Sequence, residues 1–307
     1  MTIKQINQLL TPQRSGHIPR APAFIVTLYG DAIEPRGGTL WMGDLVSCCA
    51  EQGISESLVR TAVSRLVAAG KLLGERIGRR SFYRLTDQAQ AEFRLASKVL
   101  YAPPPAARGW LLALKTREAL PEGWVSLANG VALAPNRTDI ARPKGALVSG
   151  EAIGERADWP GLAADLWDLG VVGERYRLFL QRFDALEDML RDGSLKDVDG
   201  KTALALRLSL IHHYRLAALK DPRLPREAWP EDWPAPDARR LFVRLYLALA
   251  SAADGFIGRS FSDSLGLLSS ATEATDLRLD RLGAWSWPAG RAWVLAMSSR
   301  SAYSPQP

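Results

Sequence analysis

One stretch, Ser55 to Leu85, constrains the fold of this chain most strongly because it joins a helical pattern to a hairpin pattern. Apolar residues recur there at spacings of three and four, which predicts an amphipathic helix from Glu56 to Ala69. Ser55 is placed to cap the first turn through its side chain, and Gly70 is placed to end the helix in the left-handed conformation. We expect the buried face to consist of Leu58, Val59, Ala62, Val63, Leu66 and Val67.

The residues after Gly70 alternate up to Ile77, turn at Gly78 and Arg79, and resume as SFYRL, which is typical of a two-stranded hairpin. From Ser55 to Arg84 there are seven basic and two acidic residues, an excess of five in a chain whose net charge is +6. Short hydroxyl side chains interleaved with arginines on the polar helix face suit a DNA major groove. The candidate DNA-binding residues are Ser55, Ser57, Arg60, Thr61, Ser64, Arg65, Arg76, Arg79, Arg80 and Ser81.

Two shorter amphipathic patterns, APAFIVTLYGDAI and LWMGDLVSCCAEQGI, precede this stretch and predict two more helices. The segment Glu34 to Trp41 between them is long enough to supply a short strand that pairs with the hairpin. The order of helix, helix, helix and hairpin indicates a winged helix-turn-helix, in which one helix enters the major groove and the basic wing lies along phosphates. The alternative is that the charges only solvate a small domain, or that it contacts another protein.

The rest of the sequence argues against several other classes. A hydrophobic fraction of 47% with 23% charged residues is ordinary for a soluble globular protein, and no stretch of about 20 apolar residues could span a membrane. The two cysteines, Cys48 and Cys49, are adjacent, which suits neither a disulfide framework nor a metal site. Nucleophile-elbow, P-loop, zinc-protease and dinucleotide motifs are absent. We expect a cytoplasmic protein that is not an enzyme and has no catalytic residues, metal or cofactor.

At this point the sequence resembles a known family. TLYGDAIEPRGGTLWMGDLV and ESLVRTAVSRLVAAGKLLGERIGRRSFYRLT are similar to the amino-terminal domain of the PaaX family, repressors of bacterial phenylacetic acid catabolism. LWDLGVVGERYRLFL, LIHHYRLAALKDPRLPREAWPEDWP and ARRLFVRLYLAL are similar to its later blocks, so the resemblance covers roughly residues 21–253.

The resemblance implies an α+β multidomain protein with a winged-helix domain, a small central ferredoxin-like domain related to a CRISPR-adaptation nuclease, and a helical carboxy-terminal domain. The expected division is a flexible N-terminus at 1–20, the DNA-binding domain at 21–100, a proline-rich linker at 101–109, the ferredoxin-like domain at 110–160, the helical domain at 161–297 and a tail at 298–307. The segment after the first central strand is compressed, so we expect an abbreviated ferredoxin-like topology. The strand Trp110 to Lys115 carries no acidic residue to hold Mg²⁺, which argues against nuclease activity.

The family further implies a homodimer on double-stranded operator DNA that is released by phenylacetyl-coenzyme A, without a membrane. Candidate ligand-binding residues are Arg175, Tyr176, Arg177, His212, His213 and Arg215, which offer cations beside aromatic rings. Packing at a helix interface, or ordinary solvent exposure, is the alternative for each of them. The functional alternatives are a paralogous repressor that responds to another acyl-coenzyme A or aromatic acid, a hydrolase or nuclease with a DNA-binding domain, and an interaction scaffold.

Overall fold

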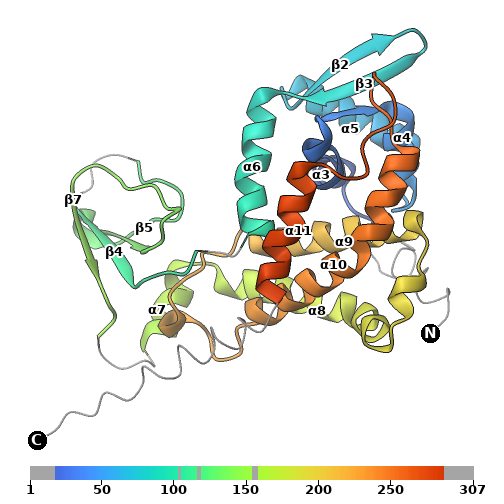
Figure 1. The fold of residues 1–307 in the computed structure, drawn as a ribbon. Coiled ribbons are helices and arrows are strands. Elements are labelled where there is room, and N and C mark those ends of the chain that lie inside the picture. The colour runs from blue at the N-terminus through green and yellow to red at the C-terminus, as the bar shows by residue number, and fades with distance from the viewer. Residues whose placement is uncertain (1–17, 103–104, 116–118, 154–157, 287–307) are drawn as a thin grey trace, which may run out of the picture. The chain divides into compact units, whose positions relative to one another are not determined.

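A computed structural model describes residues 18–102, 105–115, 119–153 and 158–286 (Figure 1). This described part is α+β, with nine α-helices and two small antiparallel sheets. The described residues form two compact units, each assembled from separate segments of the chain. Of the described residues, unit one takes 18–102, 179–215 and 237–286, and unit two takes those between 105 and 178 together with 216–236. The sequence predicts domains that follow one another along the chain, whereas each of these units combines segments that are far apart in the chain. The predicted boundary after residue 20 lies close to the start of the described part, and the one after residue 297 lies outside it.

Unit one begins with helix α3, Ala21–Leu28, whose Phe24, Ile25 and Leu28 are fully buried. A π-helical turn, Tyr29–Ile33, and a 3-10 turn, Glu34–Arg36, extend α3, and the run ends at Gly37 in the left-handed region. Strand β1, Thr39–Trp41, follows directly. The predicted short strand between the first two helices is therefore confirmed.

Helices α4, Met42–Ala50, and α5, Glu56–Ala68, are joined by a turn in which Ile54 is buried. The α5 helix ends as the sequence predicts: Gly70 has a φ of 66°. The amide of Lys71 donates to the carbonyl of Leu66, and that of Gly70 to Val67, which is the Schellman pattern. The expected side-chain cap at the other end is wrong, because the Ser55 hydroxyl makes no capping bond and lies 3.2 Å from the Ser57 hydroxyl.

Strands β2, Leu72–Ile77, and β3, Arg80–Leu85, form the predicted hairpin with its turn at Gly78. Strand β3 also pairs with β1, which gives the antiparallel order β1-β3-β2 and places Phe82 opposite Trp41. Helix α6, Asp87–Tyr101, follows, and the Thr86 hydroxyl caps it by accepting from the Ala89 amide. Tyr101, which the sequence assigns to the linker, is a buried residue of this helix.

The remaining helices of unit one come from far along the chain. They are most of α8, Leu169–Asp192, and α9, Gly200–Ala218, together with α10, Ala235–Ser260, and α11, Glu273–Ser286, with a 3-10 turn at Ser194–Asp197. Among the described helices, α10 alone is long and apolar enough to cross a membrane. Half of its most apolar stretch is buried inside the structure, and the core helix of a soluble protein can pass the same test of length and composition.

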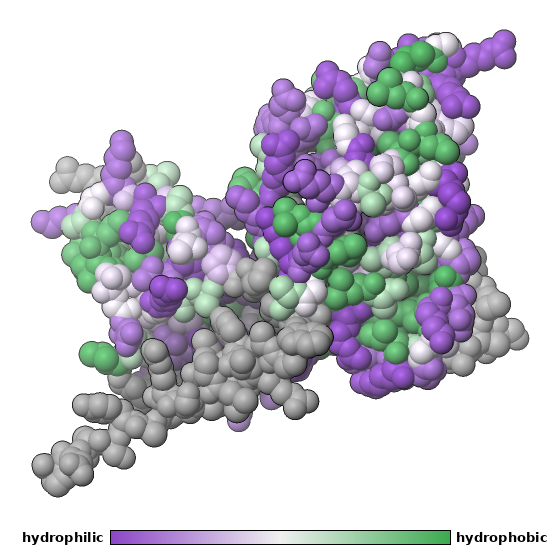
Figure 2. All heavy atoms as spheres, viewed as in Figure 1, coloured by the Kyte–Doolittle hydropathy of each residue, from purple (hydrophilic) through white to green (hydrophobic). Residues whose placement is uncertain are grey.

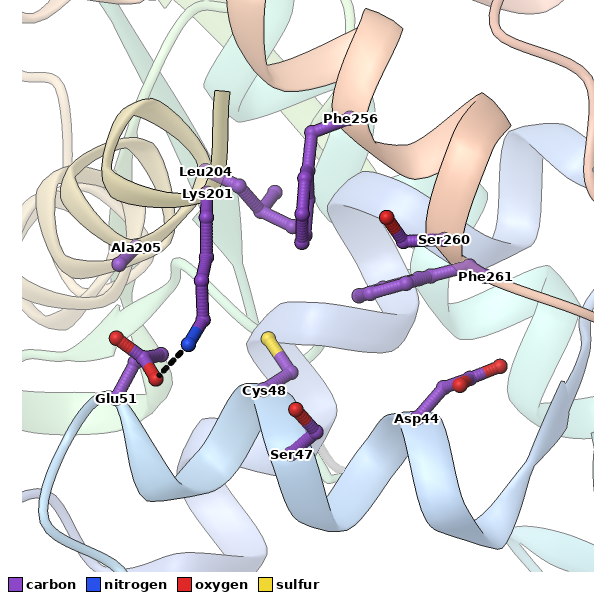
Figure 3. A pocket seen from close by; sticks show the side chains of 10 residues that line it. All are labelled: Asp44, Ser47, Cys48, Glu51, Lys201, Leu204, Ala205, Phe256, Ser260 and Phe261. Carbon is purple, nitrogen blue, oxygen red and sulfur yellow. Dashed lines mark ion pairs between the residues drawn. The ribbon is translucent and has the colours of Figure 1, made fainter. Parts of the chain in front are cut away.

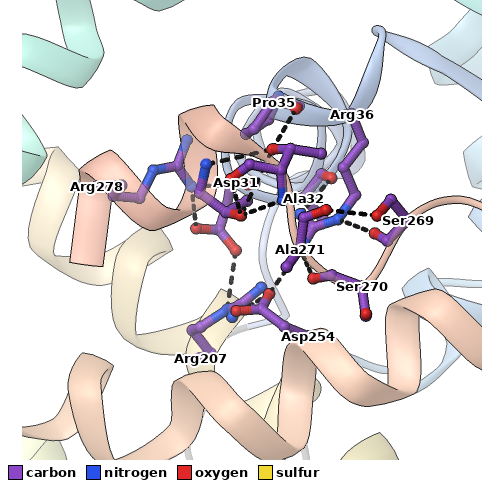
Figure 4. Close-up of polar contacts among 12 residues, drawn as sticks. Asp31, Ala32, Pro35, Arg36, Arg207, Asp254, Ser269, Ser270, Ala271 and Arg278 are labelled. Carbon is purple, nitrogen blue, oxygen red and sulfur yellow. Dashed lines mark hydrogen bonds and ion pairs between the residues drawn. The ribbon is translucent and has the colours of Figure 1, made fainter. Parts of the chain in front are cut away.

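A buried ionic cluster joins the amino-terminal part of unit one to these later helices (Figure 4). Asp31 has a fully buried side chain, and its Oδ1 accepts hydrogen bonds from Tyr101 (3.2 Å), Tyr246 (2.8 Å) and Arg278 (3.0 Å). Its Oδ2 lies 3.0 Å from Nε of Arg207. Burial raises the pKa of Asp31, but the guanidinium groups of Arg207 and Arg278 outweigh burial and hold that pKa below its ordinary value.

Asp254 is the second acidic residue of this cluster. Its Oδ1 accepts from Arg207 at 2.8 Å and from Arg36 at 2.9 Å. Arg36 also donates to the carbonyls of Ser269 and Ser270. The segments 18–102, 200–215 and 237–286 of unit one therefore share one polar core, and the helix-helix-helix-hairpin module is not separate from the later helices of this unit.

Unit two is built on a four-stranded antiparallel sheet in the order β5-β6-β4-β7. Its strands are β4 (Trp110–Leu114), β5 (Val125–Ser126), β6 (Ala132–Pro135) and β7 (Ala146–Gly150). Helix α7, Asp158–Leu166, the start of α8 and the 3-10 turn Arg226–Ala228 also belong to it.

The two faces of this sheet have separate cores. Trp110 and Leu133 pack with Leu224 and the helical residues Ala163 and Leu169 on one face, where the Trp110 ring stacks 5.1 Å from that of Trp159. Leu111, Ala113, Trp124, Ala132, Ala134 and Ile140 form the core of the other face.

Between β4 and β7 the only helical segment among the described residues is a 3-10 turn, Ala128–Gly130. In this part of the chain the sheet therefore lacks the helices that a ferredoxin-like fold places between its strands. The compressed segment agrees with the expected abbreviation, and the ferredoxin-like assignment itself stays a prediction.

Candidate nucleic-acid interface

The polar face of α5 is open to solvent. Ser57, Arg60, Thr61, Ser64 and Arg65 are all exposed, as is Ser55 just before the helix. On the inner face, Val59, Ala62 and Val63 are buried, and α5 packs against α3 and α4. The helix therefore presents every predicted recognition residue on the side away from its core.

Two residues of the predicted buried face are in fact exposed. Leu58 is 54% exposed and Val67 is 37% exposed. The spacing of three and seven residues places Leu58 on the same face as Thr61 and Arg65. Sequence reasoning missed Leu58 as a candidate contact, because an apolar residue beside buried positions carries no local signal that it faces outward.

Local bonds hold two of the polar side chains of α5. Nε of Arg60 donates to Glu56 at 2.8 Å, in an ion pair whose two side chains are more than half exposed. The Thr61 hydroxyl donates to the carbonyl of Ser57 at 2.9 Å. An exposed pair one helical turn apart contributes little to stability, so Arg60 can exchange Glu56 for an acceptor on DNA.

The hairpin carries its three predicted arginines, Arg76, Arg79 and Arg80, in exposed positions around the turn, while Ser81 is half-buried. Nε of Arg76 donates to the carbonyl of Gly78 at 3.3 Å. The guanidinium of Arg80 lies 4.7 Å from the ring centre of Trp41, within the range of a cation–π contact. Trp41 therefore supports Arg80, a role that the sequence pattern did not indicate.

One basic residue of this stretch, Lys71, is paired with a residue outside the stretch. Nζ of Lys71 lies 2.6 Å from Oε1 of Glu92, which is on helix α6 and 21 residues away. No local pattern predicts this pair. The remaining arginines of α5 and the hairpin form an exposed cationic surface, which we call the basic surface: Arg60, Arg65, Arg76, Arg79, Arg80 and Arg84.

The predicted ligand-binding residues fall into two groups. Arg175, Tyr176 and Arg177 lie on α8 in unit two. Arg175 donates to the carbonyl of Leu216 at 2.9 Å, and Arg177 lies 3.6 Å from Glu174. Tyr176 is buried, and its hydroxyl donates to Asp221 at 3.0 Å.

The second group, His212, His213 and Arg215, lies on α9 in unit one. Nδ1 of His212 is 3.2 Å from the Thr27 hydroxyl. Arg215 donates to that hydroxyl and to the carbonyl of Ala23, both at 3.0 Å. Nδ1 of His213 lies 2.8 Å from the carbonyl of Ser209, one turn back on the same helix. His212 and Arg215 thus join α9 to α3, which agrees with the helix-interface alternative, and their ligand-binding role stays a prediction.

A small pocket lies in unit one between α4, the start of α9 and the end of α10 (Figure 3). Leu204, Phe256, Phe261 and Cys48 supply its apolar wall, and the ion pair of Glu51 with Lys201 (2.7 Å) borders it. Burial raises the pKa of the Cys48 thiol well above its ordinary value, so this thiol is not a ready nucleophile. None of the predicted ligand-binding residues lines this pocket.

The described residues contain no group of three His, Cys, Asp or Glu side chains that could hold a metal ion. The exposed, cationic face of α5 and its hairpin is therefore the best-defined candidate site in the described part of the chain. Its hydroxyl and guanidinium groups can donate hydrogen bonds to phosphates and to base edges.

Comparisons with known proteins show the family of this chain. The model of the PaaX-like protein family matches residues 20–89, and that of the PaaX-like protein C-terminal domain matches residues 167–259. An uncharacterized protein from Mycobacterium tuberculosis is 25% identical, with a TM-score of 0.40, over 69% of this chain and 89% of that protein. The transcriptional repressor PaaX of Escherichia coli is 32% identical over 271 residues, which cover 80% of this chain and 85% of that protein. The chain therefore belongs to the PaaX family.

Proposed function

We propose that this protein is a cytoplasmic transcriptional repressor of phenylacetic acid catabolism genes that binds double-stranded operator DNA. In this proposal α3, α4, α5 and the β1-β3-β2 sheet form a winged helix-turn-helix, with α5 as the recognition helix. The observation that carries it is the basic surface, where the exposed polar face of α5 and the arginines of the hairpin belong to one compact unit. The similarity to a transcriptional repressor supports the same function.

The two parts of the basic surface have different roles in this proposal. Arginines at the tip of the hairpin contact phosphates, which gives affinity and a steep dependence on salt but no sequence preference. Arg60, Thr61 and Arg65 contact base edges in the major groove, and exposed Leu58 beside them is suited to a thymine methyl group.

Release by an effector completes the proposed mechanism. We infer that the protein acts as a homodimer on a roughly palindromic operator and that phenylacetyl-coenzyme A favours a state that fits the operator poorly. The thioester then weakens operator binding by its differential affinity for the two states. A paralogous repressor that responds to another acyl-coenzyme A or aromatic acid is the second candidate, and titration of several thioesters against the operator complex separates the two.

The recognition-helix assignment is tested with Arg60→Ala. We expect the ratio of operator affinity to random-DNA affinity to fall by about 1–3 kcal/mol, because a base contact is lost. Arg240→Ala is a matched control, since Arg240 is also an exposed helical arginine with an acidic partner on its own helix, Asp237. Fluorescence anisotropy on both DNAs gives the ratio. An unchanged ratio for Arg60→Ala would remove the assignment, and a protein with no operator preference at moderate salt would favour an interaction scaffold.

A further inference from the structure

The chain between α10 and α11 forms a tight turn, Ser262–Leu267, at the edge of the β1-β3-β2 sheet (Figure 1). We call this segment the α10–α11 turn. Its two end residues pair in an isolated antiparallel bridge. The amide of Trp41, in the edge strand β1, donates to the carbonyl of Ser262 at 2.9 Å. The turn therefore extends the edge of the sheet whose hairpin carries part of the basic surface.

Hydrogen bonds fix the shape and the position of the α10–α11 turn. The amide and the hydroxyl of Ser262 donate to Oδ2 of Asp44, in the first turn of α4, at 2.8 and 2.9 Å. Inside the turn, Oδ1 of Asp263 accepts from the amides of Leu265 (2.7 Å) and Gly266 (3.0 Å). Asp263 is the only charged residue of the turn, and its carboxylate is bonded to the turn's own backbone.

Two leucines of this turn face solvent. Leu265 is 95% exposed and Leu267 is 65% exposed. Figure 2 shows hydrophobic residues next to strongly hydrophilic ones at the end of unit one that carries the hairpin. A single exposed leucine needs no explanation, but two leucines on a hydrogen-bonded turn form an apolar projection that is suited to a contact.

The α10–α11 turn is continuous with the basic surface. Trp41, whose amide binds the turn, also lies under the guanidinium of Arg80, which is 4.7 Å from the centre of its ring. Trp41 sits opposite Phe82, two residues from Arg80, and Arg80 sits opposite Ile77. Opposed residues, and residues two apart in a strand, lie on one face of a sheet, so Trp41, Arg80 and Ile77 share a face. Because Ile77 is 46% exposed, apolar and cationic side chains lie together from the hairpin tip to the turn.

We propose that the α10–α11 turn is a further DNA contact, which places Leu265 in the minor groove next to the major-groove segment that α5 enters. This inference rests on the proposed function and extends the interface beyond the winged helix-turn-helix. In a helix-turn-helix the first helix crosses the DNA backbone, and the turn is bonded to the first turn of that helix, α4. Arginines suit phosphates, whereas leucine is one of the side chains that enter the minor groove and wedge between base steps.

Binding of a leucine variant tests the contact by its energy. Leu265→Ser should weaken operator binding about tenfold, because apolar surface is no longer buried against DNA. The slope of log affinity against log salt should stay as in the wild type, because no charge is removed. Leu277→Ser is the matched control, since Leu277 is an exposed leucine of α11 in the same unit, and it should bind like the wild type. Both variants should keep the thermal midpoint, and an unchanged affinity of Leu265→Ser overturns the proposal.

Directed cleavage tests the contact by its position. Leu265→Cys is labelled with a thiol-reactive iron–EDTA reagent, while the natural Cys48 and Cys49 are buried and stay unlabelled. The Leu265→Cys conjugate should cut the bound operator beside the segment that α5 covers, and a Leu277→Cys conjugate should not. Selective operator binding without such cuts overturns the proposal, leaves the proposed function standing and favours a protein partner for the turn. Cuts in random DNA by a protein with no operator preference would refute the proposed function and support the contact.

Discussion

Replacing Asp31 with asparagine should be among the most damaging conservative changes in unit one. The side chain keeps its shape, but Arg207 and Arg278 lose the carboxylate that they share. Arg207 is 1% exposed and Arg278 is 6% exposed, so water cannot replace the lost charge. Oδ2 of Asp31 lies 3.0 Å from Nε of Arg207. In one orientation of the asparagine amide, its NH₂ group would take the place of Oδ2, so that two hydrogen-bond donors would face each other.

The expected loss can be bounded from this geometry. Removing one partner of a buried ion pair costs about 3–5 kcal/mol, because the remaining charge is left uncompensated. Arg207 keeps its bond to Asp254, and Arg278 keeps its bond to the carbonyl of Asp31, so the lower half of that range applies. The pKa of Asp31 is lowered by folding, so the stabilisation is present above about pH 4 and is lost as the pH falls through the lower folded-state value.

Urea unfolding at pH 7 measures this effect. At about 2–3 kcal/mol per molar of urea, the midpoint should fall by roughly 1–2 M with little change in slope. Asp237→Asn is the control, because Asp237 forms an exposed pair with Arg240, and it should change stability by about 0.5 kcal/mol or less. If Asp31→Asn is as mild as Asp237→Asn, the ionic cluster does not hold unit one together.

Two further predictions concern the basic surface and the thiols. Arg79→Ala should weaken binding to operator and to random DNA about equally and reduce the slope of log affinity against log salt by about one, because Arg79 contacts phosphate; a change in the affinity ratio would argue for a base contact instead. Burial raises the pKa of Cys49 to about 12 and that of Cys48 well above its ordinary value, so neither thiol should react with a thiol reagent at pH 8 until urea unfolds the protein. The same shifts predict that stability falls as the pH rises from about 9, where thiols of the unfolded chain ionise first. Rapid reaction of the native thiols would contradict the burial.

Local patterns predicted local structure well. The boundaries of α5, the turn at Gly78 and the left-handed Gly70 follow from residues within a few positions of one another. The predicted side-chain cap at Ser55 was wrong, and the Ser55 hydroxyl instead lies within hydrogen-bond distance of the Ser57 hydroxyl. The predicted burial of Leu58 was wrong because the spacing of apolar residues gives their angle around the helix axis. It does not give how much of the helix surface the neighbouring elements cover.

Contacts between residues far apart in the chain could not be predicted from local sequence patterns. Asp31 and Arg278 are 247 residues apart, and Arg207 reads as an ordinary helical arginine until folding brings it to Asp31. A linear reading of the sequence also cannot show that helices after residue 200 share a core with the first hundred residues. The contacts of the candidate ligand residues His212 and Arg215 with Thr27 also join distant parts of the chain, so the sequence pattern did not predict them.

The proposed function is tested most directly by the binding of purified protein to its own upstream promoter DNA, measured by fluorescence anisotropy with and without phenylacetyl-coenzyme A. We expect the protein to bind this DNA tightly in preference to a scrambled sequence, and to be released by the thioester but not by free phenylacetate. Equal affinity for promoter and scrambled DNA would contradict the central claim that the basic surface reads an operator, and selective binding that ignores the thioester would contradict the proposed effector.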